Sequence, residues 1–215
     1  MINEIPISSA VQTFDKFAEK YDRKYELHLP YIETYKKLAG LLPPDKHGSV
    51  LDIGCGPAHA SRYLINEGFE IDVFGIDLSL NMLRLARKNV PSGNFQQFDC
   101  RKLDVLDRKF DIVICGFCMP YLDPSECSKL IEDFATALKP GGIGYISAIE
   151  GDKYQVADHV SPTDDFLPIH HHSSASMFQE FARVGLEVVD VERKAIISAD
   201  GSENLEVFFY VQNES

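Results

Sequence analysis

The segment VLDIGCGPA, residues 50–58, decides the fold of this 215-residue chain. A short apolar run ends in Asp52, and Gly54 and Gly56 then form a tight turn that leads into a predicted helix. Glycine readily adopts left-handed backbone angles and lets a ligand approach the bare backbone. The N-terminus of the following helix offers unpaired N–H groups and a partial positive charge. We therefore expect a site for a pyrophosphate or a carboxylate here; a plain glycine turn is the alternative.

The spacing of the glycines argues against a nicotinamide dinucleotide as the ligand. The fingerprint G-x-G-x-x-G, counted from Gly54, requires glycine at position 59, where this chain has His59. The match fails at its third glycine, so a nicotinamide-dependent Rossmann enzyme is disfavoured.

Strand-like and helix-like segments alternate along most of the chain. Short apolar strands are predicted at residues 49–53, 71–76, 94–98, 110–115 and 141–149, with helices between them. This alternation favours a parallel, doubly wound sheet with helices on both faces. The predicted strands 186–196 and 205–212 are separated only by the turn-rich SADGSEN (198–204), so they must form an antiparallel hairpin. The fold class is therefore α/β, a Rossmann-like seven-stranded sheet that is mostly parallel.

The regions outside this core have different patterns. Apolar residues recur every three or four positions within residues 9–42, which predicts helices ahead of the sheet. Residues 150–172 show no clear periodicity, which predicts a long substrate loop or lid. We expect a single domain over residues 1–215, with a helical cap at 1–47, a cofactor-binding core at 48–149, and the substrate loop, helix and hairpin at 150–215.

Two further acids follow predicted strands. Asp77 ends the second strand, about 20 residues beyond the glycines, where a carboxylate can accept from both hydroxyls of a ribose. Asp99 closes the third strand. With Asp52, three acids then lie at the carboxyl edge of the sheet, which is where open α/β sheets bind ligands.

In this order and spacing, four motifs resemble those of class I S-adenosylmethionine-dependent methyltransferases. They are VLDIGCGPA, GIDLS followed by Met82 and Ala86, FDIVIC (110–115) and LKPGG (138–142). The resemblance covers about residues 48–149. FDKFAEKYD (14–22) is also similar to the N-terminal helix of the small-molecule members. The chain departs from many relatives at Ala58, where they carry glycine; alanine is small enough for close helix–strand packing.

The resemblance implies S-adenosylmethionine as the cofactor and assigns residues to it. Asp52, Gly54 and Gly56 would line its methionine part, and Asp77 would hold the ribose. Leu78 and Met82 would flank the adenine, Asp99 would accept from its amino group, and the amide of Cys100 would reach a ring nitrogen. The expected cofactor-binding residues are Tyr21, Asp52, Gly54, Gly56, Asp77, Leu78, Met82, Asp99, Cys100 and Cys115.

The stretch FDIVICGFCMPYLD (110–123) contains a Cys-x-x-Cys spacing, so a dithiol redox protein using Cys115 and Cys118 is an alternative function. A reactive thiol of that kind needs a helix N-terminus directly behind its first cysteine. The next helix is predicted to start only near Asp123, so we expect both cysteines to line a cleft. A cofactor-binding protein without catalysis is the third hypothesis.

Candidate substrate residues are Cys118, Tyr121, His170 and His172, the last two on one side of an extended segment. A solvated histidine tract is the alternative for the His pair, and no ligand spacing predicts a metal. CMPY (118–121) stands where nucleic-acid amino-methylating enzymes of the superfamily carry Asn-Pro-Pro-Tyr, and cysteine lacks the carbonyl acceptor. No catalytic base is predicted.

The charge and the cysteine content point in the same direction. The 33 acidic and 21 basic residues give a net charge of −12, which disfavours nucleic acid and anionic membranes as partners. The N-terminus has no apolar h-region, and the five cysteines fit free thiols in a reducing compartment. We expect a cytoplasmic enzyme that methylates a small-molecule acceptor.

Overall fold

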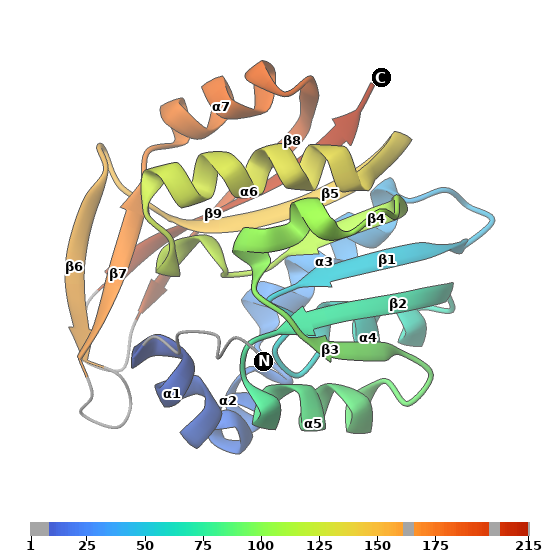
Figure 1. The fold of residues 1–215 in the computed structure, drawn as a ribbon, viewed down its shortest axis with the longest axis horizontal. Coiled ribbons are helices and arrows are strands. Elements are labelled where there is room, and N and C mark those ends of the chain that lie inside the picture. Colours follow the sequence, from blue (N-terminus) through green and yellow to red (C-terminus); the bar gives the residue numbers. More distant parts are fainter. Residues whose placement is uncertain (1–8, 161–165, 198–202, 215) are drawn as a thin grey trace.

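A twisted sheet with helices on both faces organises the computed structural model, which describes residues 9–160, 166–197 and 203–214 (Figure 1). The expected strands are β1 (His47–Ile53), β2 (Glu70–Asp77), β3 (Asn94–Gln97), β4 (Phe110–Cys115), β5 (Leu138–Glu150), β8 (Leu186–Ile197) and β9 (Glu203–Asn213). Their spatial order is β3-β2-β1-β4-β5-β9-β8, parallel from β3 to β5, with β9 antiparallel to both β5 and β8. The predicted sheet and its C-terminal hairpin are therefore confirmed, although most of the predicted turn at 198–204 lies outside the described residues.

The helices come from the segments with helical periodicity. They are α1 (Ser9–Lys16), α2 (Ala18–Tyr25), α3 (Leu29–Leu41), α4 (His59–Asn66), α5 (Leu80–Asn89), α6 (Pro124–Ala137) and α7 (Ser174–Arg183), with short 3₁₀ turns η1 (Cys100–Val105) and η2 (Met119–Tyr121). The N-terminus of α6 is a capping box, in which Asp123 accepts from backbone amides and Glu126 accepts from the amide of Asp123.

Side-chain alternation along β9 shows how the two faces of the sheet are filled. Val207 and Phe209 pack with α6 and α7 in one core cluster. Phe208 and Tyr210 point to the opposite face and pack with α3 and α4 in the other. Successive strand residues point to opposite faces, so this strand contributes to both halves of the core.

The N-terminal helices are attached to the carboxyl edge of the sheet by two acids. Asp15 of α1 accepts from the backbone amide of Asn81 at 2.9 Å and from the hydroxyl of Ser79 at 2.8 Å, at the start of α5. Asp22 of α2 lies 2.7 Å from Nε2 of His59, the first residue of α4. These contacts hold α1 and α2 over the ends of β1 and β2.

Residues 150–172 differ from the expected irregular loop. They form a hairpin of β6 (Gln155–Val160) and β7 (Phe166–His172), whose connection at 161–165 lies outside the described residues. β7 pairs in parallel with the end of β5, so the sheet gains two strands beyond the seven expected. Leu167, Ile169 and His171 are buried, and Pro168 and His170 between them are more exposed. The buried histidine hid this two-residue period from a hydrophobicity pattern.

Candidate functional site

The glycine turn after β1 is connected directly to the acid at the end of β2. The backbone amide of Gly56 donates to Oδ2 of Asp77 at 2.9 Å, and the amide of Ser79 donates to Oδ1 at 2.8 Å. Burial raises the pKa of Asp77, and these N–H donors oppose that shift. Each carboxylate oxygen has two lone pairs, so Asp77 retains acceptor capacity for a ligand.

Asp52 lies beneath the same turn. It is 3% exposed, and its Oδ2 accepts from the hydroxyl of Ser61 at 2.6 Å. Burial raises the pKa of Asp52 to about 7, and the neighbouring charge of Asp77 adds to the shift. Two of the three predicted acids therefore share one buried environment.

The backbone of the turn is left-handed at three positions. Gly54 and Gly56 have φ of +60° and +51°, as the sequence predicts for a tight turn. Ala58, the N-cap residue of α4, also has φ of +60°. Alanine carries a steric penalty in this region that glycine avoids. The departure at Ala58 therefore concerns backbone strain as well as packing space.

Asp99, the third acid, is already engaged by a neighbour. Arg101 Nη2 donates to its Oδ2 at 2.7 Å and Arg101 Nε donates to its Oδ1 at 2.9 Å. Although burial raises the pKa of Asp99, the bonds from Arg101 outweigh it and hold the pKa below its usual range. Arg101 Nη1 also reaches Oε1 of Glu126 at 3.1 Å, so the acid at β3 is tied to the start of α6.

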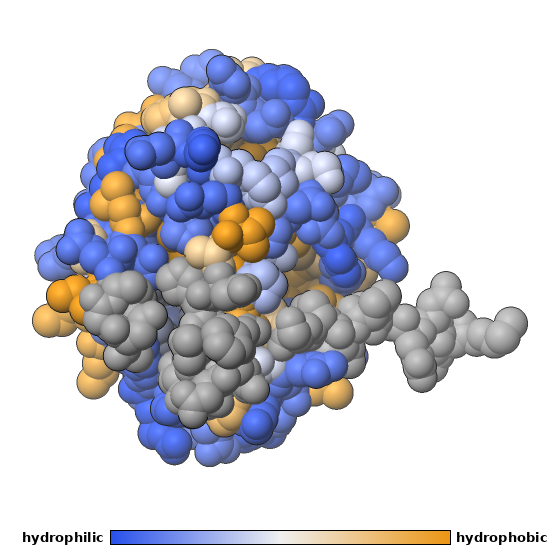
Figure 2. Space-filling view, turned by 90° about the vertical axis from the view of Figure 1, so that its left-hand side faces the viewer, coloured by the Kyte–Doolittle hydropathy of each residue, from blue (hydrophilic) through white to orange (hydrophobic). Residues whose placement is uncertain are grey.

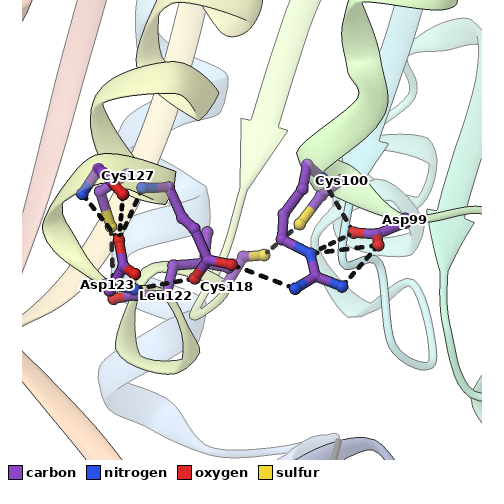
Figure 3. Close-up of polar contacts among 9 residues, drawn as sticks. Asp99, Cys100, Cys118, Leu122, Asp123 and Cys127 are labelled. Carbon is purple, nitrogen blue, oxygen red and sulfur yellow. Dashed lines mark hydrogen bonds and ion pairs between the residues drawn. The ribbon is translucent and has the colours of Figure 1, made fainter. Parts of the chain in front are cut away.

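The thiols of Cys118 and Cys100 point toward one another (Figure 3). Their Sγ atoms are 3.4 Å apart. Cys115 is fully buried at the end of β4, and a Cβ placed on Gly54 would lie 3.4 Å from Cβ of Cys118. The short 3₁₀ turn η2 follows Cys118 directly, and the next α-helix begins only at Pro124. The hydrogen bond with Cys118 and burial raise the pKa of Cys100 well above its ordinary value, so the protonated thiol is the favoured form.

Leu78 and Met82, the expected adenine neighbours, lie at the start of α5. Met82 is 2% exposed, and its sulfur would be 4.0 Å from a Cβ on Gly56. Leu78 is half-buried, and its carbonyl accepts from the side-chain amide of Gln97 at 2.9 Å. Met82 therefore borders the turn, and Leu78 contacts the end of β3.

Tyr21 and Tyr121 meet through a third aromatic ring. The ring of Phe14 lies 5.8 Å from that of Tyr21 and 5.1 Å from that of Tyr121, edge to face in both cases. Burial is the main cause that raises the pKa of each tyrosine. Tyr21, an expected cofactor-binding residue, and Tyr121, an expected substrate residue, thus belong to one aromatic cluster.

His170 and His172 lie on the same side of β7, as the predicted alternation requires, with rings 6.4 Å apart. Nε2 of His172 is 3.0 Å from the carbonyl of Met119 and 3.5 Å from Sγ of Cys127, and burial lowers the pKa of this histidine. Nδ1 of His170 is 2.9 Å from the hydroxyl of Tyr154. His172 therefore joins β7 to η2, in a strand and not in a loop.

One buried acid was missed by the sequence reasoning. Glu206 of β9 is 6% exposed; its Oε1 accepts from the hydroxyl of Tyr31 at 3.0 Å, and its Oε2 is buried without a hydrogen-bond partner. Burial raises its pKa to about 7. The available signal was the alternation in EVFFYV, which gives Glu206 the same orientation as the buried Phe208 and Tyr210.

Other classes of site find little support in the part of the chain that the structure describes. No three His, Cys, Asp or Glu side chains there are placed to hold a metal ion. None of the helices in those ranges is long and apolar enough to cross a membrane. Hydrophilic residues predominate on the visible part of the face that carries β6 and β7 (Figure 2). A surface pocket of about 320 Å³ between α1, α2 and α5, bordered by Asp15 and Arg84, lies outside the acid-lined edge.

Comparison with known proteins places this geometry in context. Residues 50–142 match the family model described as a methyltransferase domain. A Bacillus subtilis protein named as a methyltransferase, YqeM, is 36% identical over 137 residues, which are 60% of this chain and 53% of that protein. A malonyl-[acyl-carrier protein] O-methyltransferase of Enterobacter lignolyticus is 27% identical over 65% of this chain and 53% of its own. The chain spans about half the length of these two relatives.

Solved structures extend the similarity to nearly the whole chain. DhpI in complex with S-adenosylhomocysteine covers 94% of this chain and 95% of its own, with a TM-score of 0.66 and 18% identity. An S-adenosylmethionine-dependent methyltransferase from Methanosarcina mazei covers 80% and 98%, with a TM-score of 0.64 and 22% identity. At these identities the structures establish the fold.

Proposed function

This chain has the class I S-adenosylmethionine-dependent methyltransferase fold, with a methyltransferase domain at residues 50–142, and on that basis we propose that it is an enzyme that binds S-adenosylmethionine and methylates a small molecule. One observation carries the proposal: the hydrogen bond from the Gly56 amide to Asp77, which joins the turn after β1 to the acid after β2. A ligand that contacts both the left-handed turn and the carboxylate fits this arrangement.

The donor and acceptor groups at the edge are suited to the two ends of that cofactor. Asp77 has acceptor capacity for ribose hydroxyls, and the turn offers bare backbone at Gly54 and Gly56. Arg101 donates hydrogen bonds to both carboxylate oxygens of Asp99. The Arg101 side chain is 39% exposed, however, and can shift when an amino group competes for the carboxylate. We propose the cofactor roles set out above for Tyr21, Asp52, Gly54, Gly56, Asp77, Leu78, Met82, Asp99, Cys100 and Cys115.

The bound cofactor would supply an electrophilic methyl group for in-line displacement, so the protein's part is to hold the acceptor close and aligned. The aromatic cluster of Phe14, Tyr21 and Tyr121 closes the edge and would exclude water. We propose that Cys118 and Tyr121 border the acceptor. Nε2 of His172 is hydrogen-bonded to the carbonyl of Met119 in η2. We therefore propose that His172 holds η2 in place and does not act as a base.

Several observations support a small-molecule acceptor. The net charge of −12 opposes binding to nucleic acid, and Cys118 lacks the carbonyl that amino-methylating nucleic-acid enzymes use. The names of relatives include an acyl-carrier-protein O-methyltransferase and a phosphoethanolamine N-methyltransferase, so they leave the nucleophile open. We further propose that residues 1–215 act as one domain and that the protein is cytoplasmic, consistent with its five free cysteines.

Titration calorimetry with S-adenosylmethionine and S-adenosylhomocysteine tests the proposal. We expect saturable one-to-one binding of both; absence of binding would overturn it. Incubation with metabolite pools, followed by detection of S-adenosylhomocysteine, separates an enzyme from a binding protein. Binding without turnover in any pool would favour the non-catalytic alternative.

A further inference from the structure

Glu206 is a buried acid whose second oxygen has no partner. Its Oε2 is buried without a hydrogen bond, whereas Oε1 accepts from Tyr31. A buried polar atom without a partner destabilises the folded state by about 1–3 kcal/mol. Such an atom therefore calls for an explanation. Replacement by an apolar residue, as at Phe208 and Tyr210 on the same face, would remove that cost.

The strand register places Glu206 at the same edge as the cofactor turn. Ile53 pairs with Cys115, Cys115 with Ile146, and Ile146 with Phe209. Glu206 pairs with Ile149, three residues farther toward the carboxyl end of β5. Its side chain therefore lies beyond the level at which Gly54 begins, on the face covered by the N-terminal helices.

Tyr31, which donates to this carboxylate, belongs to a cluster of aromatic rings. The rings of Tyr31 and Phe117 are 4.8 Å apart, and those of Tyr25 and Tyr31 are stacked at 5.6 Å. Tyr21 adds a fourth ring, 4.5 Å from Tyr25. Besides burial, the charge of Glu206 raises the pKa of Tyr21, Tyr31 and Tyr121, so these rings share its electrostatic environment.

Phe117 reaches this cluster through an unusual backbone conformation. It has φ of +57°, which is rare for a bulky residue, and its amide donates to Oγ of Ser147 at 2.8 Å. Non-glycine residues held in this region cluster at ligand-binding and active sites. Phe117, the third residue of the Cys-Gly-Phe-Cys motif, thus places its ring against that of Tyr31 and 5.8 Å from that of Phe208.

We propose that Glu206 is the acceptor-recognition residue of this site and that the methyl acceptor is an amine whose ammonium group donates to Oε2 among these tyrosine rings. The inference rests on the proposed function. A buried carboxylate next to a cluster of aromatic rings is suited to a cation, because ring quadrupoles and the negative charge both attract it. An acceptor that offers a carboxylate would be repelled. The ammonium of Lys24, 4.7 Å from the Tyr25 ring, is an exposed cation near this site.

An amine must lose a proton before it can act as a nucleophile. Oε2 is placed to take that proton: the N–H bond breaks, its electron pair stays on nitrogen, and Glu206 becomes a neutral carboxylic acid. Because Glu206 is 6% exposed and its Oε1 is bound to Tyr31, the side chains around it must move to admit the amine. The titratable groups that interact electrostatically with Glu206 are Tyr21, Lys24, Tyr31, Tyr35, Tyr121 and Tyr145. Lys194 is its partner in the register of β8 and β9, and His171 pairs with the same β5 residue, Ile149.

The test uses three probes with the same phenyl-ethyl skeleton: phenethylamine, phenethyl alcohol and 3-phenylpropionate. Each is titrated into the S-adenosylhomocysteine-saturated protein at pH 8. We expect the amine to bind at least tenfold more tightly than the other two, and Glu206→Gln to abolish this preference. Glu203→Gln, an exposed acid on the same strand, is the matched control and should keep it.

A second readout needs no variant. Calorimetry of phenethylamine in two buffers of different ionisation enthalpy should show release of about one proton at pH 6 and almost none at pH 8, as expected for an acid that ionises on binding. Equal binding of the three probes, no binding of any, an unchanged preference in Glu206→Gln, or no proton release at pH 6 would each overturn the inference. Failure of the wild type to bind S-adenosylhomocysteine would instead overturn the proposed function.

Discussion

The backbone amide of Gly56 donates a 2.9 Å hydrogen bond to Oδ2 of Asp77, 21 residues farther along the chain. Gly56 is left-handed in the turn after β1, and Asp77 ends β2, which is paired in parallel with β1. The bond therefore forms only where the two carboxyl ends meet. It fixes the position of the carboxylate relative to the turn before any ligand binds.

The first prediction concerns this contact. Asp77→Ala removes a charged acceptor, and hydrogen bonds to charged groups contribute about 1.5–3 kcal/mol. We expect affinity for S-adenosylhomocysteine, measured by calorimetry, to fall roughly ten- to a hundredfold. Asp72→Ala, an exposed acid on the same strand paired with Arg108, should leave affinity unchanged. Equal affinity of Asp77→Ala and wild type would refute the role of Asp77.

The second prediction concerns the strained N-cap of α4. Ala58 has φ of +60°, which costs an L-residue on the order of 1–2 kcal/mol, whereas glycine adopts it freely. Glycine also loses more entropy on folding, which offsets part of this gain. We therefore expect Ala58→Gly to stabilise the protein by a net ~0.5–1 kcal/mol in urea denaturation.

Ala60, in the same helix, supplies the control for this prediction. It lies inside α4 and is buried, so Ala60→Gly should destabilise by roughly 1 kcal/mol through helix propensity. If both variants lose stability, the left-handed conformation at Ala58 carries no penalty and the explanation is wrong.

The comparison of sequence with structure shows where pattern reasoning succeeds. The glycine turn, Asp77 and the helix start near Asp123 depend on residues near one another in sequence, and the structure has each where it was expected. The pairing of Arg101 with Asp99 is equally local but depends on a side-chain rotamer, which no spacing specifies.

The hydrophobic pattern of the sequence did not predict contacts between segments that are far apart in the chain. Tyr31 and Glu206 are 175 residues apart, and their hydrogen bond follows from the packing of α3 on β9. The β6–β7 hairpin was not predicted because His171 fills an inward position that usually carries an apolar side chain. In both cases a buried polar residue interrupted the hydrophobic pattern, and a polar residue is retained in a core only with a partner or a function.

The third prediction concerns the pH dependence of stability. Burial raises the folded-state pKa of Asp52 and of Glu206 to about 7, above the unfolded values near 4. The folded protein then binds more protons than the unfolded chain between these values. Stability from these groups is complete below about pH 4 and is lost as pH rises through about 7.

Glu206→Gln removes one of the two ionisations. Between pH 4 and pH 8 the free energy of unfolding should decrease in both proteins. A shift of this size makes the decrease on the order of 2–4 kcal/mol smaller in the variant than in wild type. Urea denaturation at several pH values measures the difference. Parallel curves for variant and wild type would show that Glu206 titrates normally.

The fourth prediction concerns the cysteines. Sγ of Cys118 is 3.4 Å from Sγ of Cys100, and a disulfide requires about 2.05 Å, so a shift of roughly 1.4 Å would join them. Diamide takes up the two electrons and two protons that the thiols lose. We expect a Cys100–Cys118 bond in peptide mass spectrometry, formed slowly because hydrogen bonding and burial keep the pKa of Cys100 high.

This bond would join the residue after Asp99 to the residue beside Gly54, and so would link two segments that are expected to contact the cofactor. Oxidised protein should therefore lose affinity for S-adenosylhomocysteine and regain it after reduction. Cys115→Ser should still form the bond, and Cys100→Ser should not. A Cys115–Cys118 bond in wild type would instead support the dithiol alternative, since that pair alone has the Cys-x-x-Cys spacing.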